Sequence, residues 1–129
     1  MPHFDNQLLA MLAPQDLERL RPDLVVTDLT FGTVLAEPKQ LIDRIYFPHS
    51  GIVSFVVPLS DGPAIETGMV GRDGVVGAGE VLDGKLAVNR VVVQIAGKAS
   101  AIGIRARHLY ESQIGLITQR RGLQVVPRL

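Results

Sequence analysis

Apolar residues follow two different spacings along the chain. Near the start, leucines recur at helical spacing; these are Leu8, Leu9, Leu12, Leu17 and Leu20. Asp5 or Asn6 provides an N-cap for a first short helix. Pro14 suits the first turn of a second helix, and Pro22 ends it. We therefore expect two short helices before any strand.

From residue 24 onward the apolar residues form short β-branched runs separated by Gly, Pro and Asp. The expected strands are residues 24–29, 33–36, 44–47, 52–59, 64–70, 88–95 and 99–104. Strands that recur about every ten residues are typical of a sandwich, barrel or jelly roll, and not of a sheet with alternating helices. The sequence thus predicts a mainly β fold.

Helical spacing returns over residues 105–121, and Gly122 suits a C-cap. The apolar stripe of this expected helix consists of Leu109, Tyr110, Ile114 and Ile117. An amphipathic helix needs one apolar surface to cover its stripe. That surface is either the β domain itself or a second chain, and the pattern favours neither.

Length and composition narrow the class of protein. We expect 129 residues to form one domain, spanning residues 1–129. The chain has no cysteine, which excludes disulfides, thiolate metal sites and a cysteine nucleophile. It contains no signal-like start, and no run approaches the roughly 18 apolar residues of a membrane span. We expect a cytoplasmic protein that does not enter a membrane.

Charge is distributed unevenly although the net charge is zero. Residues 1–98 contain 8 Lys/Arg and 12 Asp/Glu, whereas residues 99–129 contain 5 Arg and a single Glu. A basic end suits nucleic acid or an acidic protein surface. Only eight residues follow the expected helix, against about sixty for a helix-turn-helix domain. We therefore expect no DNA binding by this chain alone.

The stretch "VVGAGEVLDG", residues 75–84, is similar to the start of a dinucleotide-binding turn. That turn needs a strand before its glycines and a helix of several turns after them. There is no room for the strand, because a turn at Gly71 and Gly74 comes directly before the stretch. There is no room for the helix, because Asp83-Gly84 turns the chain again. The stretch instead suits a loop between two strands of a jelly roll, where successive amides can bind an anion.

Catalytic and metal chemistry lack a convincing set of residues. The three histidines, His3, His49 and His108, lie far apart in the sequence, which argues against a metal site. Ser50 follows His49 in a Pro-His-Ser-Gly turn, without the surroundings of a nucleophile. We expect neither an enzyme nor a bound cofactor or metal.

Several segments together resemble the sensor domain of the Crp/Fnr family of transcription regulators. They are "NQLLAMLAPQDLERLRPDL", "FGTVLAEP", "IYFPHSGIVSFVV", "DGPAIETGMVGRDGVVG" and "NRVVVQIAG". The resemblance covers residues 6–104 and implies a cyclic-nucleotide-binding-like β-roll, with short N-terminal helices and a C-terminal helix. In that family the last helix pairs two subunits and leads to a DNA-reading helix-turn-helix.

The resemblance implies a ligand site but leaves two registers open. Family members that bind cyclic AMP carry Gly-Glu at the start of a phosphate loop and Arg near its end. In one register these residues are Gly79, Glu80 and Arg90, with the carboxylate on ribose and the guanidinium on phosphate. In the other register, which starts from Gly77, the family's Glu and Arg fall on Ala78 and Asn89, and neither charged group remains.

Two functions follow from these registers. An intact site predicts a sensor that binds a small anionic effector, such as a cyclic nucleotide, and signals through its C-terminal helix in transcription regulation. A degenerate site predicts an interaction module that forms a homodimer or pairs with a longer regulator.

Overall fold

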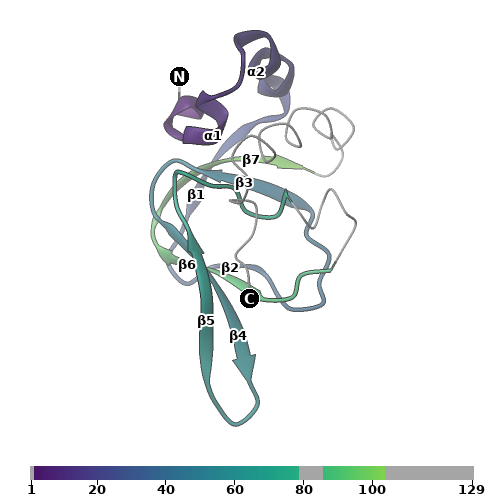
Figure 1. The fold of residues 1–129 in the computed structure, drawn as a ribbon, viewed down its shortest axis with the longest axis vertical. Helices are drawn as coiled ribbons and strands as arrows, with labels where there is room; N and C mark the ends of the chain where they lie inside the picture. The colour runs from purple at the N-terminus through teal and green to yellow at the C-terminus, as the bar shows by residue number, and fades with distance from the viewer. Residues whose placement is uncertain (1, 79–85, 104–129) are drawn as a thin grey trace.

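Short β-branched runs form strands throughout the part of the chain that the computed structural model describes, residues 2–78 and 86–103. They build two antiparallel sheets, ordered β1-β7-β3 and β2-β6-β4-β5 (Figure 1). The elements are η1 (Pro2–Asp5), α1 (Gln7–Ala10), α2 (Pro14–Leu20), η2 (Arg21–Asp23), β1 (Val25–Leu29), β2 (Val34–Ala36), β3 (Arg44–Pro48), β4 (Ile52–Leu59), β5 (Gly62–Val70), β6 (Arg90–Ile95) and β7 (Gly97–Gly103). The predicted mainly β fold with short N-terminal helices is confirmed.

One hydrophobic cluster joins the two sheets and the helices. Its largest fully buried side chains include Phe47 on β3 and Phe55 on β4, one from each sheet. Leucines on one face of α1 and α2 join the same cluster, so the helices cover one end of the roll. Each fully buried aromatic or leucine side chain contributes roughly 1.5–3 kcal/mol to stability.

Asn6 ties the first helix to the roll. Its side-chain oxygen accepts hydrogen bonds from the backbone amides of Leu8 and Leu9, at 3.0 and 3.1 Å. Its Nδ2 donates to the carbonyl oxygens of Pro48 and Gly74, at 2.8 and 2.9 Å. The expected N-cap is thereby confirmed for Asn6, and the same residue also holds α1 against the roll.

Two strands begin earlier than their sequence patterns predict. β5 begins at Gly62 and β7 at Gly97, residues that the pattern assigned to turns. Gly62 pairs with Leu59, and Gly97 pairs with Leu29, so each ladder continues through its glycine. Hydrogen bonding to a neighbouring strand extends these strands backward into residues for which side-chain preference alone predicts a turn.

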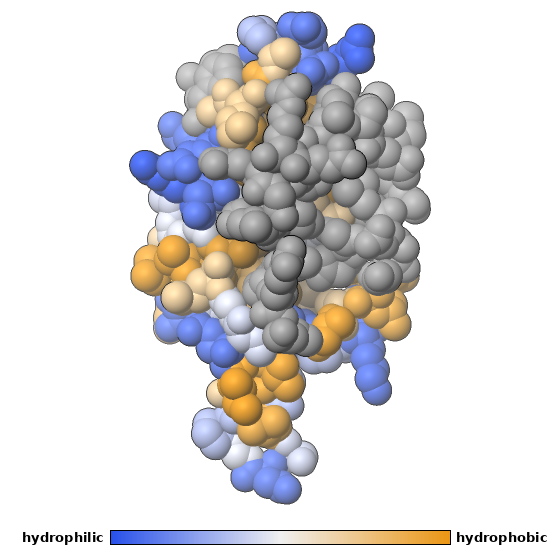
Figure 2. Space-filling view, viewed as in Figure 1, coloured by the Kyte–Doolittle hydropathy of each residue, from blue (hydrophilic) through white to orange (hydrophobic). Residues whose placement is uncertain are grey.

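The hairpin of β4 and β5 projects away from the helices (Figure 1). β4 pairs with β6 only as far as Val56, and beyond that residue only β5 accompanies it. The projecting hairpin carries exposed Leu59, Ile65 and Met69, and Figure 2 shows apolar surface along it.

Among the described helices, none is long and apolar enough to span a membrane.

Candidate functional site

The segment that leads into the candidate loop is fixed on the edge of β3. Val75 and Val76 are buried in the core. The backbone of Val76 exchanges two hydrogen bonds with Tyr46, at 2.9 and 2.8 Å. This isolated bridge holds the chain in one place directly before Gly77.

Gly77 has a conformation and surroundings that exclude other residues. Its φ is +92°, in the region that strongly favours glycine. A Cβ atom there would lie 2.9 Å from the carbonyl oxygen of Arg44 and 3.0 Å from a methyl carbon of Ile42. Ala78, which follows, is fully buried. The start of the loop is therefore packed directly against residues 42–44.

The other end of the loop is anchored on the same part of the roll. The amide of Ala87 donates to the carbonyl oxygen of Gln40 at 2.9 Å, and the amide of Lys39 donates to Ala87 at 2.7 Å. A further bridge joins Leu41 to Leu86. Residues 39–44 thus contact both ends of the loop.

Asn89 directly precedes β6, and Arg90 is the first residue of that strand. Asn89, Val91 and Val93 are buried, whereas Arg90 and Val92 are half-buried. This alternation is typical of a strand with one face toward the core. Asn89 therefore belongs to the inner face of the roll, and Arg90 to the outer face.

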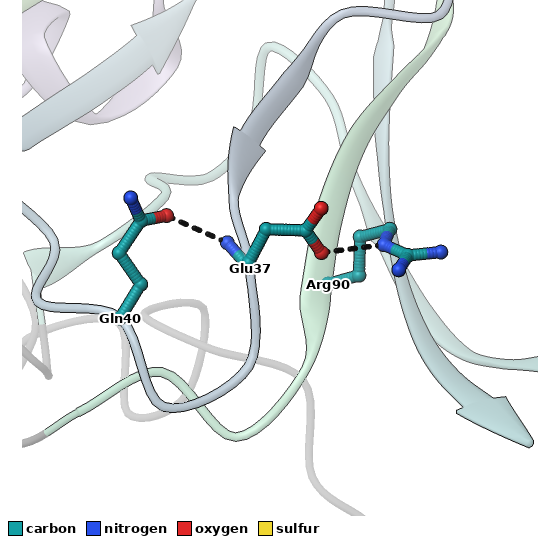
Figure 3. A network of polar contacts seen from close by, with 3 residues as sticks. All are labelled: Glu37, Gln40 and Arg90. Atoms are coloured by element: carbon teal, nitrogen blue, oxygen red, sulfur yellow. Dashed lines mark hydrogen bonds and ion pairs between the residues drawn. The ribbon is translucent and has the colours of Figure 1, made fainter.

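Arg90 is engaged in an ion pair on that outer face (Figure 3). Its Nε lies 2.6 Å from Oε1 of Glu37, and the backbone amide of Glu37 donates to Gln40 at 2.9 Å. The side chains of Arg90 and Glu37 are 37% and 50% exposed. Such an exposed pair contributes little stability, but it holds the guanidinium away from the core.

Asn89, in contrast to Arg90, is buried and has an unpaired side-chain oxygen. The residue is 8% exposed, and its Oδ1 is buried without a hydrogen-bond partner. No Lys, Arg, Asp or Glu is buried within residues 2–78 and 86–103. The described inner face therefore offers a neutral amide and no charged side chain.

Several residues of the predicted site lie outside the described residues. They are Gly79 and Glu80 in the loop, and Leu109, Tyr110, Ile114 and Ile117 of the expected C-terminal helix. Of the ligand-site predictions, the structure places Gly77, Ala78, Asn89 and Arg90. The role of each stays a prediction.

A buried polar cluster that the sequence analysis missed lies where the N-terminal helices meet the roll. Oγ of Ser100 is 2.5 Å from Nδ1 of His3 and 2.6 Å from Nε2 of His49. Burial lowers the pKa of both imidazoles below their ordinary value of 6.5, and for His3 the charge of His49 adds to this effect. No sequence pattern joins these residues, because Ser100 is 97 positions from His3.

The helices also contact the segment that precedes the loop. The amide of Gln7 donates to the carbonyl oxygen of Arg72 at 2.8 Å, close to the bond from Asn6 to Gly74. The described residues contain no group of three or more His, Asp or Glu side chains that could hold a metal. The polar contacts here connect structural elements.

No family model and no curated protein matches the sequence. Solved structures do match. The regulatory subunit of a cAMP-independent protein kinase A from Trypanosoma cruzi, bound to guanosine, is 16% identical with a TM-score of 0.74, over 93% of this chain and 41% of that one. The N-terminal domain of a transcriptional regulator from Streptomyces coelicolor A3(2) is 20% identical with a TM-score of 0.71, over 94% and 90%.

The catabolite activator protein of Thermus thermophilus is 16% identical with a TM-score of 0.69, over 89% of this chain and 54% of that one. The chain spans about half the length of this protein and of the kinase subunit. At these identities the likeness concerns the fold. The chain has the cyclic-nucleotide-binding-like β-roll found in kinase regulatory subunits and in Crp-type regulators.

Proposed function

Because the chain has the β-roll fold of these sensor domains, we propose that it is a non-enzymatic domain that binds a small effector of the nucleoside or nucleotide class. The neighbours are regulatory or sensing proteins, and the T. cruzi subunit is bound to guanosine. The ligand lies on the inner face of the roll at Asn89, near the anchored residues Gly77 and Ala87.

The observation that carries this proposal is the double anchoring of the loop. Gly77 rests against residues 42–44, and Ala87 is hydrogen-bonded to residues 39 and 40. A loop whose two ends are held on a rigid scaffold is a common site for ligand binding.

We further propose that the domain acts in transcription regulation and reports ligand binding through residues 105–121. The match to 90% of the S. coelicolor regulator domain supports this setting. A ligand moves a helix only if it binds one helix position more tightly than another. A hundredfold difference in affinity corresponds to about 2.7 kcal/mol.

The proposal is tested by titrating the purified chain with adenosine, guanosine and their 3′,5′-cyclic monophosphates. Calorimetry measures affinity, and amide NMR spectra locate the ligand in a protein of 14.0 kDa. We expect saturable binding of at least one probe, with amide shifts at Gly77, Ala78, Ala87 and Asn89, and with the β1 amides unchanged. No binding of any of the four probes at millimolar concentration contradicts the proposal.

A further inference from the structure

Asn89 is a polar side chain in an unusual position. More than nine-tenths of its surface is buried, yet its Oδ1 has no hydrogen-bond partner. Buried acceptors in native proteins are nearly always satisfied, since an unpaired one has lost its bonds to water without replacement. Asn89 also lies two residues after Ala87, at the anchored end of the loop. A bound ligand that carries an N–H or O–H group would satisfy this oxygen.

We infer that Asn89 selects a nucleoside without a phosphate group, by accepting a hydrogen bond from the base or the sugar. This inference rests on the proposed function and narrows its ligand class. Nucleoside bases and sugars carry N–H and O–H donors. An ionised phosphate presents acceptor oxygens, which do not pair with the Oδ1 of an amide.

The distribution of charge supports the same choice. A phosphate taken out of water needs a positive side chain or several N–H donors to offset its desolvation. Within residues 2–78 and 86–103 no Lys or Arg is buried, and the nearest arginine in sequence, Arg90, is paired with Glu37 on the outer face. The described inner face can thus satisfy hydrogen bonds but offers no charged side chain to neutralise a phosphate.

The orientation of the amide group does not change this lack of charge. A half-turn of the Asn89 side chain exchanges its oxygen and nitrogen, which would offer a donor in place of an acceptor. That donor could pair with a phosphate oxygen. The group stays neutral in both orientations, however, so neither orientation supplies a charge that would neutralise a phosphate.

The test compares each nucleoside with its own cyclic monophosphate by calorimetry. The probes are adenosine, guanosine, 3′,5′-cyclic AMP and 3′,5′-cyclic GMP. The proteins are the natural chain, Asn89→Leu, Asn89→Arg and the control Arg90→Ala, which lies next to Asn89 but faces outward. Thermal unfolding without ligand checks each fold, and Asn89→Ala replaces any Asn89 variant that does not fold.

In the natural chain we expect at least one nucleoside to bind about tenfold or more tightly than its cyclic monophosphate. Asn89→Leu should weaken that nucleoside by about tenfold, the loss of one hydrogen bond to a buried group. Arg90→Ala should leave its affinity within about twofold. Asn89→Arg should reverse the preference toward the cyclic monophosphate, since it supplies the missing charge.

Two results would overturn the inference while the proposed function stands. One is tighter binding of a cyclic monophosphate that Arg90→Ala abolishes, which would make Arg90 the phosphate ligand. The other is a nucleoside affinity that Asn89→Leu and Asn89→Ala leave unchanged. Failure of all four probes to bind the natural chain would instead contradict the proposed function itself.

Discussion

Glycines with positive φ have different surroundings in this protein. Gly32 and Gly77 have φ values of +81° and +92°. A Cβ atom on Gly32 would meet nothing within 4 Å, whereas one on Gly77 would meet the backbone of Arg44. Gly62 lacks both features, because its φ is not positive and the space around it is open. These three positions separate backbone strain from steric overlap.

Substitution by alanine at these three positions should show how much backbone strain and steric overlap each lower the free energy of unfolding. We expect Gly62→Ala to change the free energy of unfolding by less than about 0.5 kcal/mol. Gly32→Ala should lower it by about 1 kcal/mol through φ alone. Gly77→Ala should lower it by about 2–4 kcal/mol, because overlap with a backbone carbonyl adds to the strain. Urea unfolding of the three variants measures this order, and equal losses at residues 32 and 77 would contradict the overlap.

The sequence alone predicted some of the contacts around the candidate site and left others open. Asn6 was one of two expected caps, since Asn and Asp have similar preferences for that position. The sequence left Asn89 and Arg90 open as alternatives. The structure buries Asn89 together with Val91 and Val93, and it pairs Arg90 with Glu37, which lies 53 positions away. Such a distant contact has no local signal.

At the scale of elements, the N-terminal helices are joined to β7 through His3, His49 and Ser100. The hydroxyl of Ser100 has one hydrogen, so it donates to one imidazole and accepts from the other. One added proton is compatible with this arrangement. Two protons would leave both rings as donors toward the same oxygen, with two positive charges whose ring centres are 6.4 Å apart. The contact therefore resists full protonation.

This contact predicts a loss of stability in mild acid. Both pKa values are lowered on folding, so the unfolded chain binds protons first as the pH falls through 6.5. The contribution of these two groups to the free energy of unfolding should be constant above that pH. Below it, the contribution should decrease until the folded-state pKa values are reached. Urea unfolding between pH 8 and pH 5 measures the decrease.

The control for this measurement is the double variant His3→Gln, His49→Gln, which keeps His108. Its free energy of unfolding should depend less on pH than that of the natural chain over the same interval. Asp5 opposes the effect at His49, because its negative charge favours the protonated ring. An equal pH dependence in both proteins would show that the histidine pair does not titrate on unfolding.

At the scale of the whole molecule, some parts of the sheets pair with a strand on both sides and others with a strand on one side only. Residues 53–56 of β4 pair on both sides, with β5 and β6, whereas Val57 and Leu59 pair with β5 alone. A two-stranded ribbon without a covered face is marginally stable in water. The projecting hairpin should therefore open more often than its base.

Hydrogen exchange tests this gradient. We expect the amides of the non-proline residues within 57–65 to exchange at least about tenfold faster than those of residues 53–55, since opening of the hairpin does not require unfolding of the core. The control is β7, which pairs on both sides with β1 and β3 and should exchange as slowly as the base of β4. Uniform protection along β4 would contradict a weakly supported hairpin.

The fold was predictable to a greater extent than the contacts. Strand runs and turn residues predicted the mainly β architecture, because β-branched residues favour strands and Gly, Pro and Asp favour the turns between them. The starts of β5 and β7 were missed, since strand pairing extends through Gly62 and Gly97. The cluster of His3, His49 and Ser100 depends on tertiary contacts, which no local pattern encodes.

The order of the strands also determines when this protein can fold on the ribosome. β6 lies inside one sheet and β7 at the centre of the other, with only Ala96 between them. The strands on either side are synthesised earlier and have no central partner until residues 90–103 have left the exit tunnel. Contacts of such high sequence separation form slowly. We therefore expect the nascent chain to keep apolar strands exposed until residues 90–103 have emerged, and to close both sheets in one step after that.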